Sequence, residues 1–166
     1  RGVGDNLVPL AQRIILFRRT DPMVNIAYYL QGEEEIGSPF AKQRYGSLEL
    51  PNIDLWIEET GYFYNNGRQR FLVLNHNELL SAVLASLQEV LTARDRTWTI
   101  SHRPLNKAFG TNGCPCLTHL LRDIPYLAIG PNDDSCTIHG VNESLDPTLL
   151  PLCAEQLHRV VQVLAR

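Results

Sequence analysis

Short strand-like runs alternate with helix-like runs along this chain, and their order constrains the fold more than any other feature. We expect strands at residues 24–31, 53–57, 68–74, 97–101 and 126–129. We expect helices at residues 5–19, 39–48, 77–93, 116–122 and 147–164. A strong turn signal, Asn65-Asn66-Gly67, predicts a β-hairpin between residues 62–64 and 68–74. Strands that alternate with helices predict an α/β fold with a doubly wound, mostly parallel sheet and helices on both faces.

Three adjacent glutamates, Glu33-Glu34-Glu35, follow the first expected strand. In that strand apolar residues from Val24 to Leu30 alternate with other residues, and Gly32 then permits a sharp exit. Doubly wound sheets collect ligands at the carboxyl ends of their strands, and a cation is one natural reason for adjacent carboxylates. The stretch therefore indicates a metal site, although a solvated acidic turn is the simpler alternative for three glutamates alone.

Other candidate ligands occupy similar positions in the expected fold. Glu58 and Glu59 follow the second expected strand, and Asp5 lies at the start of the first expected helix, on the turn that leads into it. Taken alone, Asp5 is more often a helix N-cap. His139 follows the punctuated stretch at residues 130–134, and a lone loop histidine is more often structural than a ligand. These residues all lie at strand ends or in the loops beyond them, where an α/β fold binds its ligands.

Length and composition limit the class of protein. A chain of 166 residues is long enough for one domain with a substantial core. Its 18 acidic residues outnumber its 15 Lys and Arg residues, which gives no support for nucleic-acid binding. No apolar run approaches the roughly 20 residues of a membrane span. We therefore expect a single domain that binds neither nucleic acid nor membrane.

The cysteines indicate a reducing compartment. Cys114, Cys116, Cys136 and Cys153 do not resemble the framework of a disulfide-dense secreted scaffold. Cys114-Pro-Cys116 with His119 could hold a soft metal, but a lone C-x-C lacks the second ligand pair of a structural zinc site. Buried free thiols are the favoured interpretation. This pattern predicts a cytoplasmic protein.

Five stretches occur in an order that resembles one family of enzymes. They are R-G-V-G-D at residues 1–5, G-E-E-E-I-G-S-P at 32–39, D-L-W-I-E-E-T-G at 54–61, G-T-N-G at 110–113 and G-P-N-D-D-S-C-T-I-H-G-V-N-E at 130–143. The chain resembles the co-catalytic zinc metallopeptidases and deacylases that include acetylornithine deacetylase, succinyl-diaminopimelate desuccinylase, aminoacylase and carboxypeptidase G. The resemblance spans almost the whole chain and implies a zinc-peptidase-like fold.

The resemblance implies a catalytic base and three of the metal ligands. In that family an aspartate bridges two zinc ions, and the matching residue is Asp5. The family's Glu-Glu pair maps to Glu34 as the general base and Glu35 as a zinc ligand, and its late histidine ligand maps to His139. Carboxylate and imidazole ligands suit zinc, which lowers the pKa of bound water and polarises a scissile carbonyl. Glu34 would take the proton of that water and pass it to the leaving amine.

The remaining assignments also come from the resemblance. The family has a further acidic ligand after the next strand, which maps to Glu59, with Glu58 one residue away as the alternative. The family's Gly-Thr-Asn and Gly-Pro loops near the substrate pocket map to Thr111, Asn112 and Gly130. We therefore expect these three residues to contact substrate.

The sequence departs from the family pattern in three places. The family's early His-x-Asp motif, which supplies a zinc ligand, has no counterpart before Asp5. Leu7-Val8 stands where the family usually has Lys-Gly. The family inserts a lid or dimerisation domain where this chain passes directly from residue 74 to the helix at residue 77. We therefore expect a catalytic domain without the lid and without the His-x-Asp segment.

These departures affect the metal sites and the sheet. One zinc site, formed by Asp5, Glu35 and His139, could be complete, whereas its neighbour would keep Asp5 and Glu59. The expected cofactor is one or two zinc ions, with cobalt or manganese as substitutes. The family's N-terminal portion also carries sheet strands, and without them a sheet edge would lie open. Three explanations stay open: a first part left out of this sequence, a partner segment that completes the sheet, or a shrunken relative that no longer catalyses.

The leading expectation for function is a zinc-dependent hydrolase of amide bonds in N-acyl amino acids or small peptides. One alternative is a non-catalytic metal-binding or interaction module that retains the fold and one metal site. A lidless zinc aminopeptidase is the other alternative, although residues 130–143 fit the deacylase pattern more closely. Arg103 and Lys107 could pair with a substrate carboxylate, but solvated cations are the simpler interpretation.

Overall fold

The computed structural model describes residues 2–20, 23–32, 38–59, 61–102, 121 and 123–166. These residues form a six-stranded sheet of β1 (Trp56–Glu58), β2 (Tyr62–Phe63), β3 (Gln69–Leu74), β4 (Trp98–His102), β5 (Tyr126–Ala128) and β6 (Asn132–Asp133). The hydrogen-bonded order of five strands is β1-β5-β3-β2-β6, and the sixth strand, β4, also pairs with β3. Strand β3 is therefore the centre of the sheet.

The sheet is mixed in direction. The β1–β5, β3–β4 and β2–β6 pairs are parallel, whereas β3 runs antiparallel to both β2 and β5. The predicted hairpin is confirmed, because the Tyr64 N–H donates to the Arg68 carbonyl over 2.9 Å and Gly67 has a φ of 77°. This turn reverses the chain before β3, so β2 and β3 cannot be parallel. The expected mostly parallel, doubly wound sheet is not confirmed.

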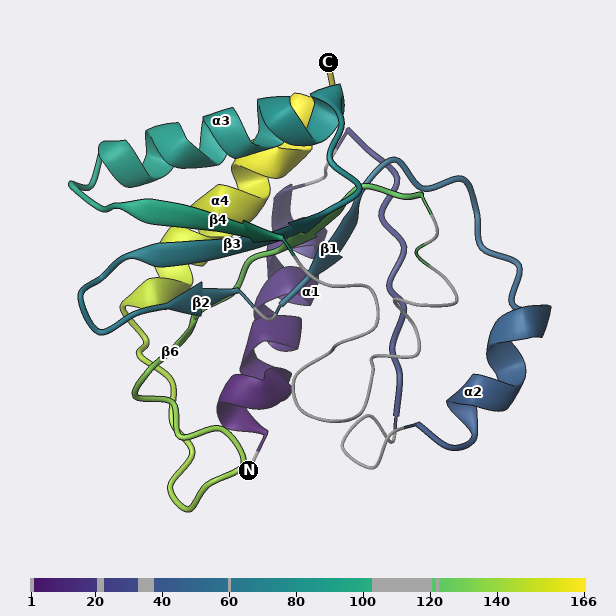
Figure 1. Cartoon of the computed structure of the whole chain (residues 1–166), viewed down its shortest axis with the longest axis horizontal. Helices are drawn as coiled ribbons and strands as arrows, with labels where there is room; N and C mark the ends of the chain where they lie inside the picture. Colours follow the sequence, from purple (N-terminus) through teal and green to yellow (C-terminus); the bar gives the residue numbers. More distant parts are fainter. Residues whose placement is uncertain (1, 21–22, 33–37, 60, 103–120, 122) are drawn as a thin grey trace.

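Three long helices, α1 (Val8–Thr20), α3 (Glu78–Thr92) and α4 (Leu149–Leu164), lie on one face of the sheet (Figure 1). Side chains alternate along β3, so Phe71 and Val73 pack with these helices and Leu72 points to the other face. In the described part of the chain, the other face carries a smaller apolar cluster instead of a long helix. That cluster contains Leu72, Leu121, Tyr126 and Ala128, with Trp56, Leu74 and Ile124 packed against it. The expectation of helices on both faces is therefore not confirmed.

Local signals explain why α3 forms where it was expected. The Asn77 side chain accepts the backbone N–H of Leu80 over 2.9 Å and caps the helix, and Glu78 suits the positive end of the helix dipole. The buried side chains of α3 recur at helical spacing and are Leu80, Val83, Leu84, Leu87, Val90 and Leu91. Helix α4 packs against α3 and presents its own buried stripe to the same core. Both predicted helices are confirmed.

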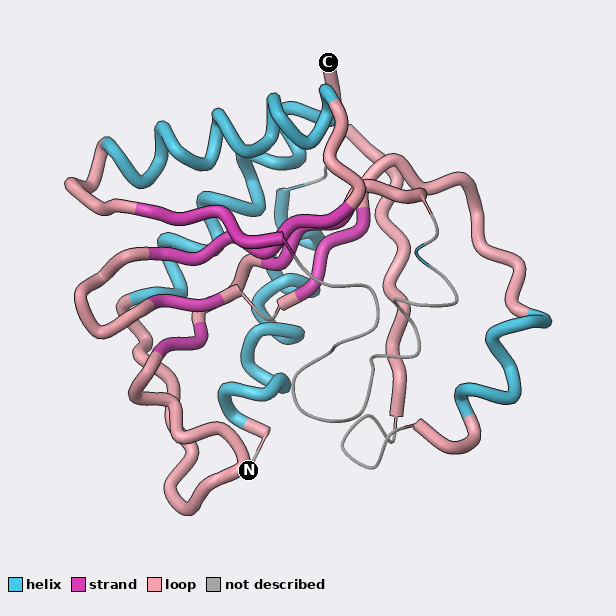
Figure 2. Tube along the Cα trace, in the orientation of Figure 1, coloured by secondary structure: helices cyan, strands magenta, loops and turns pink. Residues whose placement is uncertain are grey.

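Several other elements differ from their predictions. The helix expected at 5–19 begins as an irregular turn, η1 (Val3–Leu7), before α1. The helix expected at 39–48 is the short α2 (Ala41–Arg44) followed by η3 (Tyr45–Ser47). Residues 24–31 are extended but do not belong to a strand of the sheet (Figure 2), and most of the helix expected at 116–122 lies outside the described residues. Among the helices that the structure describes, none is long and apolar enough to cross a membrane.

Candidate metal centre

Two strands bring their carboxyl ends together at the candidate site. β1 and β5 are parallel, with Glu58 paired to Ala128, so Glu59 and Gly130 follow neighbouring strand ends. The backbones are so close that a Cβ atom on Gly130 would lie 1.8 Å from the Glu59 carbonyl oxygen. Similarly, a Cβ atom on Gly61 would lie 2.2 Å from the Gly130 nitrogen. Backbone packing therefore explains both glycines, and the substrate-binding role of Gly130 stays a prediction.

Asp5 and His139 are in contact near these strand ends. Asp5 lies in η1, where its φ of −122° and ψ of 89° are not helical, and the Asp5–Asn6 peptide bond is cis. His139 lies in the loop between β6 and α4, and Figure 1 shows this loop beside the N-terminal end of the chain. The His139 Nε2 atom is 3.2 Å from Asp5 Oδ2, and the side chains are 55% and 30% exposed. Asp5 is therefore a partner of His139 and not a simple helix cap.

The loop that carries His139 has an unusual backbone. Thr137, His139 and Asn142 have φ values of 46°, 64° and 62°, in the left-handed region that non-glycine residues rarely occupy. The Ser144 N–H donates to the Cys136 carbonyl over 3.0 Å, and this bond closes the loop. Strained backbone that the surroundings hold in place is a feature of functional sites. The loop is consistent with such a site.

Glu143 joins this loop to the residues that precede α1. Its Oε1 atom accepts the backbone N–H groups of Gly4 over 2.8 Å and Asp5 over 3.0 Å, and Oε2 accepts that of Gly2 over 3.1 Å. The Asp5 N–H makes the largest contribution to a pKa of Glu143 below its ordinary value, and the other two N–H groups act in the same direction. No role for Glu143 was predicted from the sequence. The only signal was its place in the motif at residues 130–143.

Glu59 lies beside the same turn through Asn6 and Arg13. The Asn6 side-chain amide donates to Glu59 Oε1, and Arg13 Nη1 is 3.9 Å from Glu59 Oε2. Arg13 Nη2 also donates to the Ile129 carbonyl over 2.8 Å, so the partly buried guanidinium links both strand ends. Burial lowers the pKa of Arg13, and the charge of Glu59 opposes that shift. Neither Asn6 nor Arg13 was a candidate from the sequence.

The structure distinguishes Glu59 from its neighbour Glu58. Successive side chains of an extended chain point in opposite directions, and Glu58 accepts a hydrogen bond from the Tyr126 hydroxyl. Tyr126 belongs to the smaller apolar cluster on the face opposite the long helices. Glu59 is thus the carboxylate that contacts the residue next to Asp5.

Four predicted site residues, Glu34, Glu35, Thr111 and Asn112, lie outside the described residues. The same holds for the residues named in the other side-chain predictions, namely Arg103, Lys107, Cys114, Cys116 and His119. Among the described residues, no three side chains of His, Cys, Asp or Glu form a group that could hold a metal ion. The described part of the site therefore supplies two ligand candidates in contact, with Glu59 nearby.

The described cysteines are consistent with structural thiols. Cys136 and Cys153 are both free and buried. Burial raises the pKa of the Cys136 thiol to about 11 and that of the Cys153 thiol to about 12. Both thiols are therefore neutral at pH 7 and are poor metal ligands or nucleophiles.

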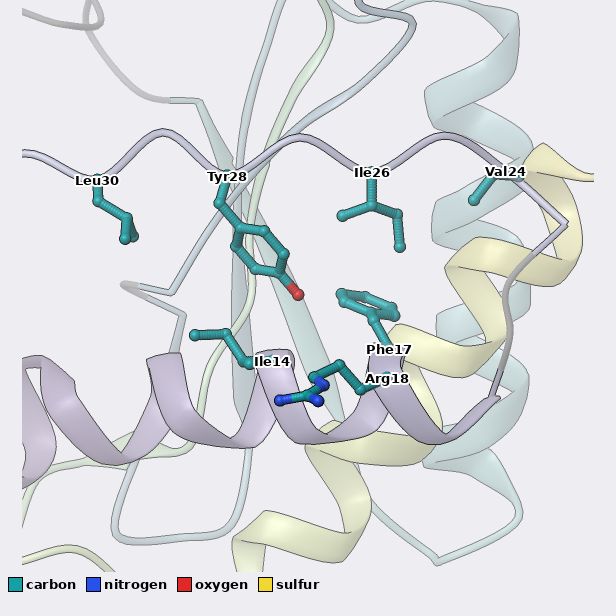
Figure 3. Close-up of a pocket in the computed structure, with 7 residues that line it drawn as sticks. All are labelled: Ile14, Phe17, Arg18, Val24, Ile26, Tyr28 and Leu30. Carbon is teal, nitrogen blue, oxygen red and sulfur yellow. The ribbon is translucent and has the colours of Figure 1, made fainter.

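A groove of about 520 Å³ lies between α1 and the extended residues 24–30 (Figure 3). Figure 3 shows Phe17 facing Ile26, and the Tyr28 hydroxyl donates to the Arg13 carbonyl over 3.3 Å. The lining residues are Ile14, Phe17, Arg18, Val24, Ile26, Tyr28 and Leu30. This groove follows the second half of α1, whereas Asp5 precedes the helix. The partner segment expected to complete the sheet stays a prediction.

Comparisons with known proteins found no match to this chain among protein families, curated proteins or solved structures. The functional assignment therefore depends on the residues of the chain itself.

Proposed function

We propose that this chain is the catalytic domain of a zinc-dependent hydrolase of amide bonds in N-acyl amino acids or small peptides. The observation that carries the proposal is the 3.2 Å separation of Asp5 Oδ2 and His139 Nε2. In this proposal the mixed sheet is the core of a doubly wound, zinc-peptidase-like fold. The buried free thiols Cys136 and Cys153 support a cytoplasmic location.

The spacing of the two described donors supports the proposal. Two ligands about 2.0–2.1 Å from a tetrahedral zinc ion lie roughly 3.3 Å apart, close to the Asp5–His139 separation. One carboxylate and one imidazole belong to the usual ligand types for this metal. His139 is 55% exposed, so a ligand could reach its ring. Glu35 is the proposed third ligand.

Each protein group then has a defined task. Bound zinc would lower the pKa of water and polarise the scissile carbonyl. Glu34 accepts a proton from the attacking water and donates it to the leaving amine. Asp5 and His139 would hold the metal, and Asp5 would also be a ligand of a second ion. Thr111, Asn112 and Gly130 contact the substrate.

Hydrolysis assays test the proposal directly. The 166-residue chain is incubated with a panel of N-acyl amino acids and dipeptides, before and after chelation, and amine release is measured. We expect zinc-dependent release that falls at least 100-fold in His139→Ala, because the metal would lose a ligand. The matched control is His158→Ala on α4, whose ring contacts Gln162 over 3.1 Å. Activity that survives both chelation and His139→Ala would refute the proposal.

One observation favours a second candidate function, a non-catalytic metal-binding module. Glu59 accepts from Asn6 and lies 3.9 Å from Arg13 Nη1, so a second metal ion would have to compete with a cation for this carboxylate. A module of this kind would bind one ion and catalyse nothing. Turnover of any N-acyl amino acid by the chain excludes it.

A further inference from the structure

Glu143 connects the two segments that supply the described ligand candidates. It lies four positions after His139 in the loop that precedes α4, and its carboxylate binds the backbone of Gly2, Gly4 and Asp5. All three donors are backbone N–H groups within four consecutive residues. A single carboxylate thus holds the turn that contains Asp5 against the loop that contains His139.

The turn is shaped to receive this carboxylate. Gly2 has a φ of 85°, a left-handed conformation that lets its N–H point toward Glu143 together with those of Gly4 and Asp5. A Cβ atom on Gly4 would lie 3.2 Å from the Ser144 carbonyl oxygen, 3.3 Å from Asn132 Oδ1 and 3.6 Å from Glu143 Oε1. Any side chain at position 4 would therefore crowd the groups that surround the Glu143 carboxylate.

A buried polar side chain lies next to the turn. Asn132 is 4% exposed, and its Oδ1 atom has no hydrogen-bond partner within the described part of the structure. The Asn132 amide lies beside Gly4 and occupies space next to the turn, but its Oδ1 atom makes no hydrogen bond to the turn. Hydrogen bonds to an ionised carboxylate are roughly twice as strong as neutral ones. Glu143 is thus the main polar anchor that the described residues give this turn.

We infer that Glu143 is a positioning residue of the candidate metal centre, which holds the Gly2–Asp5 turn so that the Asp5 carboxylate faces His139. The inference rests on the proposed function for the metal, but its structural part concerns the metal-free chain as well. Glu143 acts through Asp5 and does not touch substrate. Without it, the Asp5 turn would have three unanchored N–H groups, and the carboxylate and the imidazole would no longer be held together.

Two measurements on the 166-residue chain separate the structural part from the metal part. The first is NMR hydrogen exchange of the Gly4 and Asp5 amides in the zinc-free chain. The second is zinc affinity, measured by competition with a chromophoric chelator. The variants are Glu143→Ala, Glu143→Gln, which keeps one acceptor oxygen, and Gly4→Ala, which keeps the carboxylate but crowds the turn. Glu155→Ala is the control, because this surface acid on α4 pairs only with Arg94 among the described residues.

We expect Glu143→Ala to speed exchange of both amides at least tenfold and to weaken zinc binding about 10- to 100-fold, as loss of an outer-shell partner does. Glu143→Gln should keep part of the zinc affinity that Glu143→Ala loses. Gly4→Ala should weaken zinc binding although the carboxylate is retained. Glu155→Ala should change neither the amide exchange nor the zinc affinity. Unchanged amide exchange in Glu143→Ala would overturn the inference. Zinc affinity within twofold of the original chain, despite faster exchange, would also overturn it.

The same experiment separates this inference from the proposed function. An original chain that binds no zinc would refute the metal centre. Even in that case, faster exchange of the Gly4 and Asp5 amides in Glu143→Ala would show that Glu143 holds the turn. Unchanged exchange would refute this role of Glu143 as well.

Discussion

Asp5 and His139 are 134 positions apart in the sequence, yet Asp5 Oδ2 and His139 Nε2 are 3.2 Å apart in the structure. The contact joins the turn before α1 to the loop before α4. Glu143 fastens the two segments through three backbone N–H groups. The contact is a hydrogen bond or ion pair in the structure, and a carboxylate beside an imidazole is also a pair of groups that the proposed zinc ion would use.

Gly130→Ala should destabilise the protein, because the new Cβ atom would lie 1.8 Å from the Glu59 carbonyl oxygen. We expect a loss of about 3 kcal/mol or more, at the upper end for overpacking a core. The free energy of unfolding in urea measures this effect. Gly32→Ala is the control, because its Cβ atom would meet no atom within 4 Å. Unchanged stability with weaker substrate binding would assign Gly130 to the substrate pocket instead.

Substitutions of Gln69 and Gln156 should have non-additive effects on the free energy of unfolding. Both side chains are fully buried, and each amide donates to the other, over 3.0 Å and 2.5 Å. Gln69→Leu alone should cost about 1–3 kcal/mol, because it leaves the buried Gln156 amide without its partner. The double variant Gln69→Leu/Gln156→Leu should recover part of this loss. Equal, additive losses in urea unfolding would show that the two amides do not depend on each other.

The hydrogen bond from the Tyr62 hydroxyl to Asp134 should make a pH-dependent contribution to the stability of the protein. The hydrogen bond to Asp134 is the main cause that raises the pKa of Tyr62 to about 12, and burial adds to it. The same bond lowers the pKa of Asp134 from 3.8. Because the pKa of Tyr62 is raised, its stabilising effect is present below pH 10 and disappears as the pH rises to about 12. Because the pKa of Asp134 is lowered, its effect is lost as the pH falls below 3.8.

Unfolding of the original chain and Tyr62→Phe at several pH values checks this prediction. The difference in free energy of unfolding should be present near pH 7 and should shrink toward both extremes. A difference that stays constant from pH 3 to pH 12 would contradict the bond.

Cys136 and Cys153 should resist alkylation in the native protein. Burial raises their thiol pKa values to about 11 and about 12, so the reactive thiolate is scarce at pH 7. The measurement uses iodoacetamide on a Cys114→Ser/Cys116→Ser variant, followed by mass spectrometry. Labelling should be slow in buffer and fast in denaturant. Fast labelling in buffer would show that these thiols are accessible.

Local sequence patterns predicted the elements that local physics determines. The cap at Asn77 and the apolar spacing of α3 predicted that helix, and Asn65-Asn66-Gly67 predicted the hairpin. The direction of the sheet was not predicted, because the antiparallel pairing of β3 with β5 joins residues about fifty positions apart. Such pairings depend on the packing of the whole chain and not on a local pattern.

The candidate site was predictable to a similar extent. Resemblance to known enzymes selected Asp5 and His139, and the structure places them in contact. Glu143 and Arg13 were missed, because their partners are backbone N–H and carbonyl groups that carry no mark in the sequence. A residue that binds backbone can be recognised only once the fold has placed that backbone beside it.

Whether Asp5 and His139 belong to a metal centre is decided by the zinc content per chain after reconstitution, measured in the original chain, in Glu35→Ala and in His139→Ala. We expect one zinc ion in the original chain and none in either variant, because Asp5, Glu35 and His139 would share one ion. Two ions in the original chain would add a second site beside Glu59 and favour a working hydrolase. No zinc in the original chain, or a full ion retained in both variants, would contradict the metal centre.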